Sequence, residues 1–212
     1  GGTDVFVVKF SPEGELLWSR ALGGPTDQTL AALAVSEDGA VMIAGSSLDQ
    51  GFLLDGMQIF NGGGHDVFVA KLDGESGAAK WTGSLGHSGN QRPSALAAGK
   101  DRVIVAGWFD GVLTCSGLGC TPEIESAGGD DAFVAAFDDA TGKRLHVRSL
   151  GGNDNDRAAA VAVDSMGRTM VAGKFEGLAA VPLDGDTFVA VLGSDLVPLS
   201  VKVFGGTPEQ EA

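Results

Sequence analysis

The chain has 212 residues, of which 43% are hydrophobic, and its formal net charge of −14 comes from 28 acidic and 14 basic side chains. Such a charge repels phosphate backbones and anionic head groups, which argues against nucleic acid and membrane surfaces as partners, and no apolar run approaches the roughly 20 residues of a membrane-spanning helix. The hydrophobic content suffices for a folded core, and 34 glycines with only seven prolines indicate short elements joined by tight turns, which predicts an all-β protein.

The predicted elements are short runs rich in Val, Ile, Phe or Ala, each bounded by Gly or Asp turns, as is typical of β-strands. In chain order they are a strand that opens with Asp-Val-Phe-Val, a strand that ends in Leu-Gly-Gly, an alanine-rich strand, and a strand that ends in Ala-Gly. A long connection then leads to a copy of the first phrase. These elements stand at residues 4–10, 15–22, 31–35, 41–45 and 66–72.

The whole pattern repeats along the chain. The Asp of the first phrase stands at positions 4, 66, 131 and 186, which are 62, 65 and 55 residues apart, and a Leu-Gly-Gly marker or a variant of it follows each copy. Two markers that move together indicate a tandem repeat. We letter the strands of one period a (alanine-rich), b (ending in Ala-Gly), c (Asp-x-Phe-Val) and d (ending at the marker). Further copies of strands a and b stand at 95–98, 103–107, 159–163 and 169–173.

Four sequential antiparallel strands in tandem copies are the signature of β-propeller blades. Strand a is poor in bulk and fits the innermost position, where large side chains would collide near the axis. The recurrent phenylalanine of strand c is expected to wedge neighbouring blades together, each ring burying apolar area worth about 1.5 to 3 kcal/mol. Isolated hairpins or a sandwich would leave the register of these rings unexplained. The expected wedges are Phe6, Phe68, Phe133 and Phe188.

The repeat also predicts how the chain divides into blades. Residues 1–24 are expected to form strands c and d of a first blade, residues 25–87, 88–152 and 153–206 three whole blades, and residues 207–212 the start of another. That is about three and a half blades, whereas closed propellers have four to eight. An open arc leaves strand edges unpaired. We therefore expect a fragment of a larger closed propeller, whose missing blades come from the same chain or from a second copy.

The order of Gly-Gly-x-Asp-x-Phe-Val-x-Lys, a turn that ends in Gly, Leu-Gly-Gly, a small-residue strand and Val-Ala-Gly resembles the secreted bacterial β-propeller repeat family. The likeness covers nearly the whole chain, with a decayed marker at Leu85-Gly-His87 and a shorter last period. It implies a secreted or cell-surface protein, extracellular or periplasmic, that serves binding or display. It brings no catalytic residue.

A second likeness concerns the turns between strands c and d. Asp73-Gly-Glu-Ser-Gly-Ala-Ala-Lys-Trp81 resembles the tryptophan-docking phrase of quinoprotein-type propellers, in which an Asp, a Ser-Gly or Thr-Gly turn and a Trp lock neighbouring blades. The Trp positions of the four copies read Trp18, Trp81, His146 and Ser200, so half of them lack the lock. Such phrases are structural in that family and do not establish a cofactor.

Two cysteines, Cys115 and Cys120, stand in the connection between strands b and c of the third blade, with two glycines between them. In a secreted protein a local disulfide is the favoured reading, worth about 2 kcal/mol in the entropic model. Reduced thiols are the alternative. A single Cys pair without a His cluster is too few for zinc.

A pair of polar residues precedes strand a in every copy, and we expect these pairs to form a ring around one mouth of the central channel. Oxygen-rich rings can bind Ca²⁺, and the densest oxygen cluster is formed by Asn153, Asp154 and Asp156, although no Ca²⁺-binding loop signature is completed. The alternative is that these side chains cap turns and satisfy loop amides. The ring residues are Asp27, Gln28, Asn90, Gln91, Asn155, Asp156, Glu209 and Gln210.

No residue set spells out a reaction. The Asp that opens strand c occurs once per repeat, so capping of backbone N–H groups explains it better than catalysis. The histidines lie at non-equivalent positions, and neither a Gly-x-Ser-x-Gly elbow nor a phosphate-binding loop is present.

The sequence therefore favours a non-catalytic binding or display module without a cofactor, which recognises a protein or glycan through its variable connections between strands b and c, at 46–64, 110–129 and 176–185. Two alternatives stay open. One is part of a propeller enzyme, a quinone-dependent dehydrogenase or a hydrolase, whose active site is completed by missing blades. The other is a structural spacer in a surface assembly.

Overall fold

The computed structural model describes residues 2–48, 51–60, 62–115, 123–176 and 186–205, and this part of the chain contains strands and no helix. The all-β prediction is therefore confirmed for the described residues, which also include no helix long and apolar enough to cross a membrane. All neighbouring strands run antiparallel.

The chain begins with a two-stranded sheet and continues into a six-stranded one, whose order is β12-β11-β8-β7-β4-β3. A separate hairpin, β5–β6, lies in the connection between β4 and β7. These strands are β1 (Val5–Phe10), β2 (Leu16–Leu22), β3 (Gln28–Val35), β4 (Val41–Ser47), β5 (Phe52–Leu54), β6 (Met57–Ile59), β7 (Asp66–Leu72), β8 (Ala79–Ser88), β11 (Val112–Cys115) and β12 (Ile124–Glu125).

Two four-stranded sheets follow, with the orders β14-β13-β10-β9 and β15-β16-β17-β18. Their strands are β9 (Gln91–Ala98), β10 (Arg102–Phe109), β13 (Asp131–Asp138), β14 (Arg144–Leu150), β15 (Arg157–Val163), β16 (Thr169–Phe175), β17 (Asp186–Leu192) and β18 (Pro198–Phe204).

The predicted strand types occupy the same place in each sheet. Within a sheet the strands lie in the order a, b, c, d. Strands a are β3, β9 and β15, and strands b are β4, β10 and β16. Strands c are β1, β7, β13 and β17, and strands d are β2, β8, β14 and β18. Strand a is longer than expected, because its polar first residues join the ladder: Gln28 pairs with Ser47, and Gln91 with Phe109.

The six-stranded sheet contains an addition that the repeat does not predict. The connection from β10 to β13 forms β11 and β12, and β11 pairs with the outer edge of β8 in the preceding sheet, with Leu113 opposite His87. One repeat thus contributes a strand to the sheet of the preceding repeat, and β8 is therefore not an edge strand.

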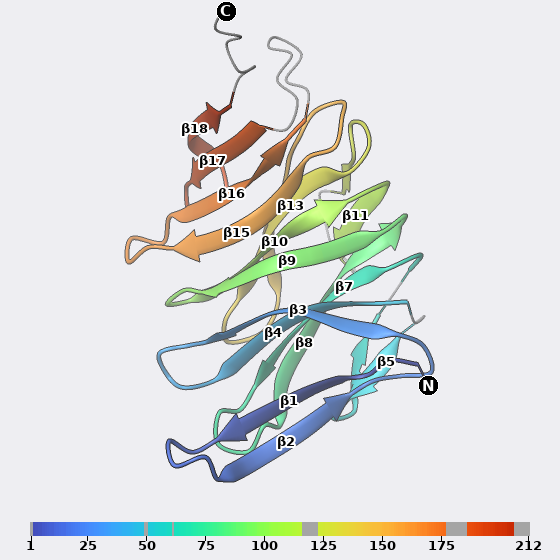
Figure 1. The fold of residues 1–212 in the computed structure, drawn as a ribbon, viewed down its shortest axis with the longest axis vertical. Coiled ribbons are helices and arrows are strands. Elements are labelled where there is room, and N and C mark those ends of the chain that lie inside the picture. The colour runs from blue at the N-terminus through green and yellow to red at the C-terminus, as the bar shows by residue number, and fades with distance from the viewer. Residues whose placement is uncertain (1, 49–50, 61, 116–122, 177–185, 206–212) are drawn as a thin grey trace, which may run out of the picture.

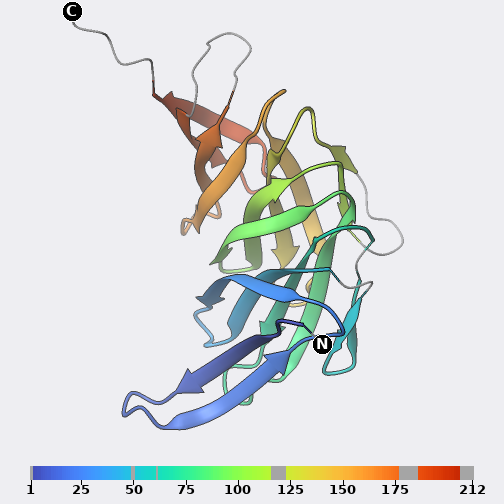
Figure 2. The same ribbon diagram turned by 45° about the vertical axis from the view of Figure 1, so that its right-hand side comes forward.

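Successive sheets follow one another along the molecule and bury apolar side chains between them. Figure 1 shows this succession from the blue hairpin β1–β2 to the red strands β17 and β18, and Figure 2 shows it after a turn of 45°. Three hydrophobic clusters fill the three gaps: one between β1–β2 and the next sheet, one between the six-stranded sheet and the sheet of β9, β10, β13 and β14, and one between that sheet and the last.

The phenylalanine of strand c packs toward the preceding sheet at three of its four copies. Phe68, Phe133 and Phe188 are buried within these clusters. Phe6 departs from the expected wedge, because its side chain is 73% exposed. Val5 and Val7 on the opposite face of β1 contact the following sheet, and no described sheet lies on the face that carries Phe6.

Candidate functional site

The antiparallel order gives every sheet two different ends. At one end lie the tight turns from a to b and from c to d, and at the other lie the long connections from b to c and the passage from d to the next strand a. In Figure 1 the β5–β6 hairpin and β11 lie at the second end. A functional surface can therefore be sought at each end separately.

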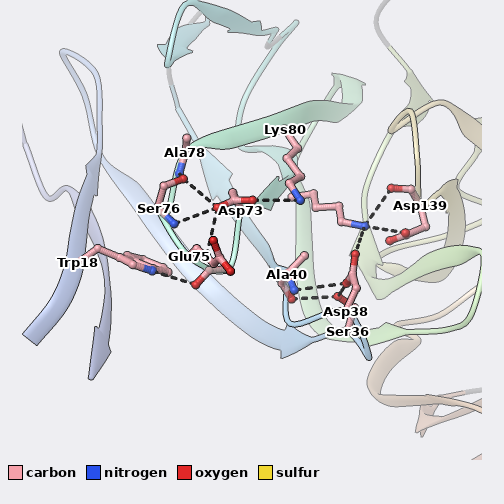
Figure 3. A network of polar contacts seen from close by, with 12 residues as sticks. Trp18, Ser36, Asp38, Ala40, Asp73, Glu75, Ser76, Ala78, Lys80 and Asp139 are labelled. Carbon is pink, nitrogen blue, oxygen red and sulfur yellow. Dashed lines mark hydrogen bonds and ion pairs between the residues drawn. The ribbon is translucent and has the colours of Figure 1, made fainter. Parts of the chain in front are cut away.

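A lysine and a tryptophan clamp the turn of the next sheet at the tight-turn end. Trp81 donates its indole N–H to the carbonyl oxygen of Asp139 at 2.8 Å. Lys71, which pairs across the strands with Trp81, lies with its Nζ 2.6 Å from Asp139 Oδ2 and 3.7 Å from Asp38 Oδ2. Lys71 is only 5% exposed, and these two carboxylates are its counterions. Figure 3 shows Asp38 and Asp139 close together at this contact.

The same clamp closes the preceding gap. The Nζ of Lys9 and the indole N–H of Trp18 both donate to the carbonyl oxygen of Gly74, at 2.6 and 3.1 Å. The indole also covers Gly77, whose φ of +70° and close contact with the ring leave no room for a Cβ. The docking phrase that the sequence suggested is therefore present as a physical lock in two gaps.

The third gap is held differently. Ala136 and His146 stand where the two preceding sheets have the clamp lysine and tryptophan, and these two residues pair with each other across β13 and β14. Instead, Leu196 of the last sheet is fully buried, and Arg102 donates to the carbonyl oxygen of Ser194 at 2.6 Å. Lysine and tryptophan are thus lost together, as expected if they act on one turn.

The clamped turn is stabilised by its first aspartate. Asp73 Oδ1 accepts hydrogen bonds from the backbone N–H groups of Glu75 and Ser76 and from the Ser76 hydroxyl, and its Oδ2 lies 3.1 Å from the Nζ of Lys80. These donors hold the pKa of the Asp73 carboxyl well below its usual range. The ionised carboxylate thus organises the turn.

The turns from a to b converge on a hollow. Turns of three successive sheets line a cavity of about 300 Å³ that presents both carboxylate and ammonium groups. Ser36 and Asp164 are already engaged with atoms of their own turns. The sequence prediction placed a channel mouth at the other end only. The lining residues are Val35, Ser36, Glu37, Ala98, Gly99, Lys100, Val163, Asp164 and Ser165.

At the opposite end, the first residue of each of the three described polar pairs caps a backbone amide. Asp27 accepts the N–H of Thr3 at 2.6 Å, and Asn155 accepts that of Asp130 at 3.1 Å. Asn90 lies 3.4 Å from the N–H of His65. These contacts tie the beginning of strand a to the residue before strand c of the preceding repeat, and they are the contacts that turn capping requires.

The second residue of each of these three pairs lies inside the protein and not at a surface opening. Gln28, Gln91 and Asp156 are each at most 1% exposed. Gln91 donates to the carbonyl oxygens of Ser88 and Asp110, at 2.7 and 3.2 Å. The physical reason for their burial is that polar backbone at the sheet junction needs side-chain partners once water is excluded.

Asp156 also bears on the calcium candidate. Its two oxygens accept the N–H groups of Glu176 and Gly152, at 2.9 and 2.6 Å. Burial raises its pKa. No group of three or more His, Cys, Asp or Glu side chains in the described part of the chain could hold a metal ion. The cluster with Asn153 and Asp154 therefore gains no support as a Ca²⁺ site.

Two of the aspartates that open strand c, Asp66 and Asp131, are buried caps. Asp66 accepts the N–H of Gly62, and Asp131 accepts that of Ala127 at 2.5 Å, which confirms the predicted capping role for these two. Burial raises the pKa of Asp66 to about 6 and also raises that of Asp131. The Asp66 carboxylate lies directly against Gly86, the glycine of the Leu-Gly marker. A side chain at this position would clash with the carboxylate, which explains the glycine.

The connection between β4 and β7 is built as an anchored hairpin. Phe52, Leu54 and Ile59 are buried among the residues of the adjoining gap, whereas Leu53 and Phe60 are 62% and 54% exposed. Sequence reasoning left this segment as a variable connection. The signal that could have found the hairpin is Asp55-Gly56, whose positive φ values of 49° and 82° suit a two-residue turn.

Several predicted residues cannot be placed. Glu209 and Gln210 of the expected ring lie outside the described residues. So does the Cys115–Cys120 disulfide, since neither Cys120 nor the side chain of Cys115 belongs to the described part of the structure.

Comparison with known proteins adds one relative. No family model matches the chain. The chain is 30% identical over 170 residues to the regulatory protein FlaEY of Caulobacter vibrioides, and the match covers 77% of this chain but 17% of that protein, so the chain spans only a small part of its relative's length. A crystal structure of a protein of unknown function from Bacteroides caccae matches 92% of this chain and 73% of its own, with 11% identity and a TM-score of 0.35, values too low to support an inference.

Proposed function

We propose that the chain is a non-catalytic binding module, built as an arc of β-propeller blades, that contacts a protein or glycan with its connections between strands b and c. The arc is supported by a difference between the two kinds of turn at the tight-turn end. Turns from a to b of three sheets line one hollow, whereas each clamped turn from c to d is tied by a tryptophan to the sheet before it. Sheets that radiate from an axis meet at their inner turns in this way.

The observation that carries the binding function is the β5–β6 hairpin. Its buried side chains fix it to the sheets, and its outer side chains Leu53 and Phe60 remain exposed. A rigid loop that presents apolar and aromatic groups loses little entropy when a ligand binds. The name of the relative, a regulatory protein, is consistent with a role exercised through binding.

The resemblance to secreted bacterial propeller repeats supports a location outside the cytoplasm, at the cell surface or in the periplasm. In such a compartment Cys115 and Cys120 would be oxidised. The blades that close the ring come from the same longer chain or from a second copy.

A matched pair of variants tests this function. Leu53→Ser/Phe60→Ser alters the hairpin, and Leu199→Ser/Phe204→Ser removes side chains of nearly equal exposure, 62% and 55%, from the last strand. On glycan and protein arrays the first variant should lose at least about tenfold in signal on the ligands of the wild type, and the second should keep it. The proposal fails if the array ligands bind both variants alike.

The two alternatives give other results. A quinone that raises the melting temperature of the wild type would favour the enzyme. A chain that binds nothing on either array would favour the spacer.

A further inference from the structure

We infer that the outer edge of β14 is a docking site for an acidic polypeptide segment, which adds to the sheet as an antiparallel strand. This site does not include the connections between strands b and c, so it stands or falls independently of the binding function proposed above. Three features of the described residues point to it: an open edge, an excess of positive charge, and buried arginine nitrogens without partners.

The edge is open and of a kind that this fold extends. β14 is the last strand in the order β14-β13-β10-β9, and no described strand pairs with its outer side. β12 lies close to β14 without forming a ladder with it. The equivalent strand of the preceding sheet, β8, accepts β11 along its outer edge. An added strand therefore reproduces a contact that the molecule already makes.

The charge of β14 selects the partner. Residues 143–148 read Lys-Arg-Leu-His-Val-Arg and hold three of the 14 basic residues of a chain whose net charge is −14, and residues 140–150 contain no acid. Lys143, Arg144 and Arg148 take part in none of the ion pairs among the described residues. Cations on an edge repel the same edge of another copy and attract an acidic strand.

Arg144 and Arg148 lie on opposite faces of β14. A bulge at Leu145 sets Arg144 opposite Phe137, and Arg148 lies opposite Val134. Phe137 faces the six-stranded sheet and Val134 faces the last sheet, so the guanidinium groups project to the two sides. The partners of the two arginines on β13 are three residues apart, which is about 10 Å along a strand. Two acidic residues three positions apart in an extended segment have this spacing and also project to opposite sides. The segment that fits best thus carries two acids three positions apart.

The arginines lack the partners that such a segment would bring. Arg144 Nη1 and Arg148 Nε are buried and form no hydrogen bond. Burial lowers the pKa of Arg144, as expected for a cation without a counterion. A carboxylate bound to the accessible nitrogens of each guanidinium group would supply the missing counterion through a charge-assisted hydrogen bond.

Fluorescence anisotropy with a labelled eight-residue peptide tests the site. The probe, called the Glu-Glu peptide, contains β-branched residues and two glutamates three positions apart, and its control carries lysines at the same two positions. The wild type should bind the first peptide at least about tenfold more tightly than the second. Arg148→Glu should reverse this preference, while Lys174→Glu, the same charge change at an exposed position of another sheet, should alter affinity by less than about twofold.

Two measurements guard against misfolding. If Arg148→Glu unfolds the chain, Arg144→Gln/Arg148→Gln replaces it and should weaken Glu-Glu binding at least about tenfold. On the wild type, saturating Glu-Glu peptide should slow amide hydrogen exchange in β14 and leave that in β18 unchanged. Equal affinity for the two peptides, no detectable binding, or unaltered exchange in β14 would overturn the inference, whereas the Leu53 and Phe60 variants should leave peptide binding intact.

Discussion

Phe68 shows how the repeated residues function as packing devices. Its ring lies against the α-carbon of Gly45, the residue opposite it on β4, and meets Phe52 edge to face at a centroid distance of 5.5 Å. The glycine of the Ala-Gly phrase thus leaves the space that the phenylalanine ring occupies.

Phe6 and Phe68 offer a matched test, because they occupy the same position of the repeat. Phe68→Ala should lower the free energy of unfolding by about 3–5 kcal/mol, since a buried ring leaves a cavity. Phe6→Ala should change it by less than about 0.5 kcal/mol, because the ring is exposed. Urea denaturation of the two variants provides the comparison, and equal losses would show that Phe6 is covered in solution.

Asp66 should make stability depend on pH. Its folded pKa of about 6 lies above its usual value, so the folded state favours the protonated acid, and the stability present below about pH 4 declines as pH rises through 6. Asp66→Asn keeps an acceptor for Gly62 and removes this titration. Between about pH 4 and pH 8 the variant should gain on the wild type by up to about 3 kcal/mol.

Urea melts at several pH values measure that difference. Asp4→Asn, at the same position of the exposed first hairpin, controls for the loss of one negative charge. Parallel stability curves for Asp66→Asn and the wild type would refute the prediction.

The clamp of Lys71 and Trp81 is the device that joins one element to the next. Both side chains reach Asp139, so their contributions to stability should be coupled. Trp81→Phe should cost about 1–2 kcal/mol through the lost hydrogen bond and packing. Lys71→Met should cost about 1–3 kcal/mol, and the double variant should cost less than the sum by at least about 0.5 kcal/mol.

A double-mutant cycle of unfolding free energies checks the coupling. Lys80→Met removes a partly exposed pair with Asp73 from the same turn region and should cost less than about 1 kcal/mol. Additive effects of Lys71→Met and Trp81→Phe would mean that the two side chains do not act on one turn.

The elements could be read from the sequence to different degrees. The Asp-x-Phe-Val and Ala-Gly phrases identify strands c and b, because their periodicity and turns are local. The burial of Gln28 and Gln91 could not be predicted, since a polar side chain enters the interior only when tertiary structure supplies backbone partners. The pairing of β11 with β8 was also hidden, because it is set by contact between two repeats.

For the whole molecule, the end faces differ from the internal gaps. Phe6 and Phe10 on β1 are exposed, as are Met170 and Phe204 on the last sheet, whereas equivalent faces between the sheets are buried. The first face resembles the side of a sheet that packs on its predecessor, and the last resembles the side that receives a successor. Further repeats packed on either end would continue the interfaces already present.

The central claim is that the sheets radiate from one axis, and distances between spin labels test it most directly. One pair of labels stands on successive inner turns, at Glu37 and Lys100, and the other on successive outer turns, at Glu75 and Ala140; all four residues are exposed. Pulsed electron paramagnetic resonance should give a shorter distance for the inner pair than for the outer pair. Equal distances would mean that the sheets are stacked in parallel and would contradict the arc.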